Sequence, residues 1–107
     1  MKGFGGGMQQ MMRQANQMQN RMKKVQEELA EQEFSGTSGG GAINVKVNGD
    51  TIVQSVKIDK EVLEAGDVEM LEDLILAAIN DAIKLAKDTS EKEMSKITGG
   101  AGMPGLF

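Results

Sequence analysis

The chain has 107 residues, a formal net charge of −4 and a sequence pI near 4.8. It has no cysteine and no histidine, which excludes disulfides, thiolate nucleophiles, the common zinc ligands and the usual general base. Its longest uninterrupted apolar run, Leu74 to Ile79, is too short to cross a bilayer. We therefore expect a soluble, cytoplasmic protein that is not an enzyme, binds no small-molecule substrate, cofactor or metal, and has no membrane partner.

The N-terminal third predicts one long helix from Met8 to about Glu33, preceded by a flexible glycine-rich arm over residues 1–7. Apolar residues recur along this helix at alternating spacings of 3 and 4, which is typical of a helix that packs along another helix. This stripe consists of Met8, Met11, Ala15, Met18, Met22, Val25 and Leu29.

The stripe has two interpretations. It forms a seam between two copies of the chain, or it is an adaptable methionine surface for helical targets. The sequence does not decide whether it packs on a twin protomer or on its own sheet. We favour the seam, and the predicted dimer interface is Met11, Ala15, Met18, Met22, Val25 and Leu29.

The same helix is basic, because no acidic residue occurs before Glu27. The positive residues in this segment are Lys2, Arg13, Arg21, Lys23 and Lys24. Arg13 and Lys24 share a helix face with Gln17 and Asn20, pointing away from the stripe. These side chains either solvate the helix or contact the phosphates of a nucleic acid. No aromatic stacking platform and no helix-turn-helix pair accompany them.

The middle of the chain predicts a small antiparallel sheet. Residues 42–47 alternate apolar and polar side chains, as a half-buried strand does. Asn48-Gly49 predicts a two-residue type I′ turn, followed by a strand from Asp50 to Ile58 with a bulge near Gln54. The segment 34–38 is a candidate third strand, joined through glycines.

The last third predicts a turn or short helix over residues 59–66 and then a second long helix, capped by Asp67 and reaching Ile97. Ala77, Ala78 and Ala82 would allow a close approach to the sheet. Residues 99–107 are predicted to form a flexible Gly/Pro tail, so residues 8–98 form a single domain. The expected fold class is α+β, with a small antiparallel sheet between two long helices.

Two other features of the sequence do not indicate a ligand-binding site. The glycine runs lack the strand-turn-helix setting of a phosphate cradle. The seven acids between Asp59 and Asp73 contain no calcium-binding loop and lie where acids favour a helix N-terminus.

Three segments together resemble the YbaB/EbfC family of bacterial nucleoid-associated proteins. They are residues 39–49 (GGGAINVKVNG), residues 56–59 (VKID) and residues 69–82, which contain EMLEDLI, AA and NDA. The methionine- and glutamine-rich first helix and the Gly/Pro/Phe tail fit the same family, so the resemblance covers nearly the whole chain.

The resemblance implies an α-β-β-β-α protomer, an intertwined homodimer with projecting helices, and no catalysis or cofactor. It also implies binding of double-stranded DNA at the nucleoid, with limited sequence preference and an influence on gene expression. The family's DNA contacts carry over only to helix positions that are basic here: Arg13, Arg21, Lys23, Lys24, Lys84 and Lys87. The alternative is a protein-interaction module, an adaptor to replication or recombination machinery, that uses the methionine stripe or the acidic second half.

Overall fold

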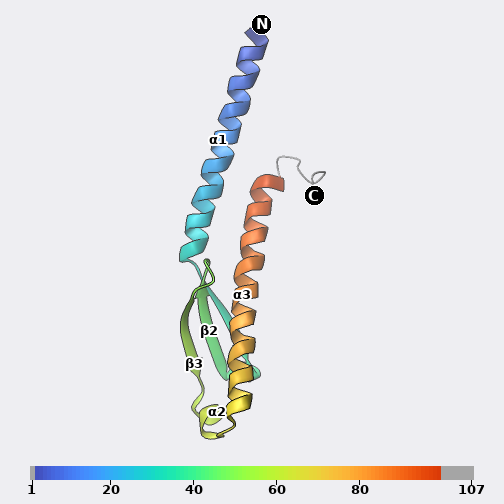
Figure 1. Ribbon diagram of the computed structural model, residues 1–107. Helices are drawn as coiled ribbons and strands as arrows, with labels where there is room; N and C mark the ends of the chain where they lie inside the picture. Colours follow the sequence, from blue (N-terminus) through green and yellow to red (C-terminus); the bar gives the residue numbers. More distant parts are fainter. Residues whose placement is uncertain (1, 100–107) are drawn as a thin grey trace.

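The computed structural model describes residues 2–99, and the side chains of residues 7–98 within them. The protein is elongated, with principal extents of 77 × 26 × 16 Å. One long helix extends from one end of a small sheet, and the other runs along the sheet and continues past the same end (Figure 1). This order confirms the predicted α-β-β-β-α fold. The elements are α1 (Lys2–Glu31), β1 (Glu33–Ser38), the 3-10 turn η1 (Gly39–Gly41), β2 (Ile43–Asn48), β3 (Val53–Ile58), α2 (Lys60–Glu64) and α3 (Val68–Gly99).

The first helix begins earlier than its sequence pattern predicts. Its backbone is helical from Lys2, so residues 2–7 continue the helix where a flexible arm was expected, even though each glycine costs about 1 kcal/mol relative to alanine in a helix. The flexibility of that arm in solution stays a prediction. The predicted tail begins at Gly99, the last residue of α3, and residues 100–107 lie outside the described residues.

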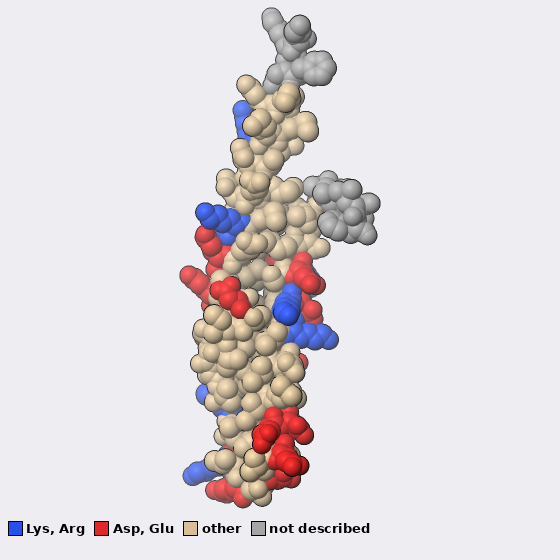
Figure 2. All heavy atoms as spheres, in the orientation of Figure 1, with Lys and Arg blue, Asp and Glu red and all other residues tan. Residues whose placement is uncertain are grey.

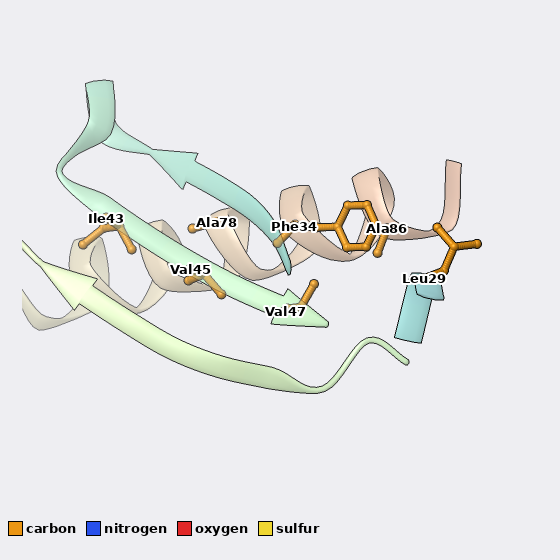
Figure 3. Close-up of a cluster of buried hydrophobic side chains, with 8 residues drawn as sticks. Leu29, Phe34, Ile43, Val45, Val47, Ala78 and Ala86 are labelled. Carbon is orange, nitrogen blue, oxygen red and sulfur yellow. The ribbon is translucent and has the colours of Figure 1, made fainter. Parts of the chain in front are cut away.

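The core lies between the sheet and α3. The strands pair antiparallel in the order β1-β2-β3, and α3 packs across β1 and β2. The alternation of β2 confirms its prediction, because Ile43, Val45 and Val47 are fully buried while the residues between them are half-exposed. Figure 3 shows the buried cluster, which consists of Leu29, Phe34, Ile43, Val45, Val47, Ala78, Ala82 and Ala86.

Close approach of backbones holds this core together. A Cβ at Gly36 would overlap the backbone of Ala78 and Ala82, so β1 crosses α3 at a distance that only glycine allows. Ala78 and Ala82 are fully buried, as predicted for small residues at a close contact. Ala77 is instead exposed, because it lies one residue further round the helix.

The β2–β3 turn differs from its prediction. The backbone N–H of Asn48 bonds the carbonyl of Ile52, so the loop contains three residues, and Thr51 has a φ of 63°. This is a turn followed by a left-handed residue, not a two-residue type I′ turn, which would need positive φ at both Asn48 and Gly49. The Asn48 Oδ1 atom accepts bonds from the N–H groups of Asp50 and Ile52, each 3.0 Å long, and favours this wider loop.

Two other local predictions are confirmed. Lys46 pairs with Ser55 and Val47 pairs with Val53, so Gln54 is the extra residue of a β-bulge. Asp67 caps α3, since its Oδ1 atom accepts a bond from the N–H of Met70 at 3.0 Å.

Candidate nucleic-acid interface

The apolar stripe of α1 divides into a packed and an exposed part. Leu29 is buried in the core and Val25 packs against it, so this end of the helix is fixed to its own protomer. Met18 and Met22 are half-buried, whereas Met11 is 70% exposed. The part of α1 that precedes Met18 in the sequence therefore projects from the body of the molecule, as Figure 1 shows.

Among the basic residues of α1, Arg13 and Lys24 lie on the side of the helix opposite the stripe, whereas Arg21 and Lys23 flank the stripe. We call Arg13, Arg21, Lys23 and Lys24 the basic face. All four side chains are exposed. The ion pairs between described residues are Lys46–Glu33 and Lys96–Glu93, so none of the four is paired within the described part of the chain. The basic face is therefore available to an anionic partner.

The two basic residues predicted on α3 lie elsewhere. Lys84 and Lys87 are exposed on the side of α3 that points away from its buried residues Ala82 and Ala86. Because α1 also packs against the buried side of α3, through Leu29, the protomer does not bring Lys84 and Lys87 onto one surface with the basic face.

Two lysines on the sheet were not among the predicted contacts. Lys46 and Lys57 alternate with buried or inward residues and lie on the sheet face that α3 does not cover. Lys46 is 3.8 Å from a carboxylate oxygen of Glu33, whereas Lys57 is exposed. Both lysines could have been found from the sequence, because the alternation of a strand places every second residue on the open face of the sheet.

The cleft between the end of α1 and α3 does not suit a phosphate. It is lined by two carboxylates and no cation: Val25, Glu28, Leu29, Gln32, Thr89 and Glu93. Among residues 2–99, no group of three His, Cys, Asp or Glu side chains is placed to hold a metal ion. Within that same range, no helix has the length and apolar character needed to span a membrane.

The charges are partly separated along the molecule. Figure 2 shows acidic side chains gathered at the α2 end with few basic ones, and both kinds mixed around the middle of the molecule. The part of α1 before Glu27 carries basic residues and no acidic ones. A polyanion is expected to meet the α1 end first, because the local field matters more than the net charge.

Comparison with known proteins identifies the family. The model of the YbaB/EbfC DNA-binding family matches residues 4–101. A nucleoid-associated protein of Clostridium novyi is 51% identical over 107 residues, which cover 98% of this chain and 94% of the relative. One from Chloroflexus aurantiacus is 54% identical over 98 residues, covering 92% and 96%.

A solved structure supports the fold. The crystal structure of an uncharacterized protein from Helicobacter pylori matches with a TM-score of 0.67 at 23% identity, covering 78% of this chain and 88% of that one. Together, the family model and the relatives span nearly the whole chain. The chain belongs to the YbaB/EbfC DNA-binding family.

Proposed function

We propose that this protein is a nucleoid-associated protein that binds duplex DNA as a homodimer, mainly through the basic face of α1. The single observation that carries the proposal is four exposed cations on α1, none of them paired within the described part of the chain, in a segment without an acid before Glu27. Family membership and the names of the relatives support DNA as the partner. The proposed location is the nucleoid of a bacterial cytoplasm.

The chemistry of the basic face favours limited sequence preference. Lysine and arginine bind phosphates as charges, which fixes position on the duplex but reads no bases. Gln17 and Asn20 lie beside Arg13 and Lys24 and add neutral donors for the backbone. An effect on gene expression would then follow from occupancy of DNA rather than from recognition of one operator.

A homodimer is supported by apolar surface that the protomer leaves open. Val53, Val56 and Ile58 pair with Val47, Val45 and Ile43 and so share their face of the sheet. The β2 residues are fully buried, whereas the β3 residues are 39–42% exposed, because α3 packs on β1 and β2. Leu76 on α3 is 58% exposed as well. A second copy would cover this surface.

The seam predicted on α1 remains part of this proposal, with a narrower extent. Leu29 retains only 6% of its surface, so it has almost nothing left to offer a partner. Met11, Ala15, Met18 and Met22 keep exposed or half-exposed side chains and stay candidates for the interface. We therefore propose a seam centred nearer the projecting, N-terminal half of the helix.

Titration of duplex binding with salt tests the proposal. If all four cations of each protomer in a dimer contact phosphates, log K should fall against log salt with a slope of about −7. Charge reversal in Arg13→Glu/Arg21→Glu/Lys24→Glu should abolish the mobility shift and leave the dimer mass by light scattering unchanged. No shift of the wild-type protein at about 50 mM salt, or a shift indifferent to salt, would reject the proposal.

A further inference from the structure

Seven of the sixteen acidic residues gather at the end of the molecule farthest from the basic face. We call residues 59–73, which form α2 and the first turns of α3, the acidic end (Figure 2). All of its charged residues are exposed, and only Lys60 is positive. The acids are Asp59, Glu61, Glu64, Asp67, Glu69, Glu72 and Asp73.

The fold prevents these acids from meeting the basic face of the same protomer. The β2–β3 turn touches α1, because a Cβ at Gly49 would overlap the backbone of Leu29. α2 follows the opposite end of β3, after Ile58, so α1 and α2 leave the sheet at opposite ends (Figure 1). In a molecule 77 Å long, the two sets of charges can be paired only between molecules.

Both surfaces are unpaired and carry apolar side chains among their charges. Neither ion pair between described residues involves the basic face or the acidic end. Leu63 and Val68 are 59% and 64% exposed within the acidic end, and Met12 is 63% exposed beside Arg13. This combination of complementary charge and exposed apolar surface is typical of a docking contact rather than of solvated charge alone.

We propose that the unpartnered basic face of α1 docks the acidic end of a second copy when DNA is absent. The contact joins two different surfaces, so it is heterologous and leaves one free surface of each kind on every assembly until a ring closes, which allows further copies to add. It uses the same cations as the proposed DNA contact. Its role as a competitor of DNA therefore rests on the proposed DNA-binding function. The acidic end would act as an internal competitor, and duplex DNA would displace it through its higher charge density and counterion release.

Sedimentation velocity without DNA tests the contact. At about 50 mM salt, the weight-average mass should rise with protein concentration, and at about 300 mM it should return to the mass of the smallest species, because exposed charges are screened. Glu64→Lys/Glu72→Lys/Asp73→Lys should remove the rise. The control Asp50→Lys/Asp88→Lys/Glu91→Lys makes the same change in net charge at exposed positions outside the acidic end and should keep the rise.

Mixing two variants makes the test specific. The acidic-end triple variant and Arg13→Glu/Arg21→Glu/Lys24→Glu should each fail to form larger species alone and should form them together, since the mixture restores opposite charges. Added duplex should dissolve the wild-type assemblies. Far-ultraviolet circular dichroism confirms that each variant is folded.

The outcomes separate this proposal from the proposed function. A mass independent of salt, or a rise that persists in the acidic-end variant, overturns the head-to-tail contact even if DNA binding is strong. Salt-sensitive assembly without any duplex binding upholds the contact and rejects the DNA-binding proposal.

Discussion

Gly36 of β1 lies against the backbone of Ala82 of α3, so closely that a Cβ on Gly36 would overlap it. The overlapped atoms belong to a helix backbone that cannot rotate away as a side chain would. This contact fixes α3 on the sheet and so determines where Lys84 and Lys87, further along the same helix, are presented.

Gly36→Ala should therefore destabilise the protein strongly. We expect a loss of about 3 kcal/mol or more in the free energy of unfolding, because one methyl group must push β1 and α3 apart in a packed core. Urea denaturation measures it. Ser35→Ala, at the neighbouring exposed position, serves as control and should change stability by less than about 0.5 kcal/mol. Equal stability of the two variants would contradict the close approach.

Thr51 holds a left-handed conformation with a φ of 63°, which is unfavourable for a β-branched residue. Thr51→Gly should raise the free energy of unfolding by about 1 kcal/mol, because relief of strain exceeds the added freedom of the unfolded chain. Thermal unfolding checks the sign. Thr51→Val keeps the strain and loses the bond from the Thr51 hydroxyl to the Asp50 carbonyl, so it should be no more stable than the wild type.

The salt dependence of DNA binding should distinguish the two helices. Lys23→Gln should lower the magnitude of the log–log slope by about 0.9 for each protomer that contacts DNA. Lys87→Gln removes the same charge from the far side of α3 and should change the slope less, because the protomer does not join that side to the basic face. Equal losses in both variants would extend the DNA contact to α3.

Variants in the two apolar surfaces should show where the dimer forms. Val56→Asp places a charge in the uncovered strip of β3, and Met22→Asp places one in the half-buried part of the α1 stripe. Either should convert the dimer to monomer if its surface is covered by a partner, because an unpaired charge in an apolar contact is costly. Light scattering gives the mass, and Gln54→Asp, at the exposed bulge, is the matched control on β3. A dimer that survives both substitutions would place the interface elsewhere.

The residue pattern predicted the secondary structure well where it depends only on side chains that are close in the sequence. The period of β2, the bulge at Gln54 and the Asp67 cap depend on residues close in sequence, and the structure confirms them. The prediction of a two-residue hairpin loop was wrong. The Asn48 side chain accepts hydrogen bonds from two backbone N–H groups and favours a wider turn than the Asn-Gly pair suggests. The glycine content of residues 1–7 predicted a flexible arm, but the backbone is helical from Lys2 onward.

Charge and periodicity are written directly in the residue types, so the order of elements, the basic character of α1 and the acidic character of residues 59–73 follow from the residues alone. The division of the α1 stripe between the core at Leu29 and the projecting methionines depends instead on contacts between distant segments. The same contacts set Lys84 apart from the basic face and place residues 59–73 at the opposite end of the sheet from α1. The physical reason is that these outcomes depend on which faces meet across the sheet, and that is set by long-range packing such as Gly36 against Ala82.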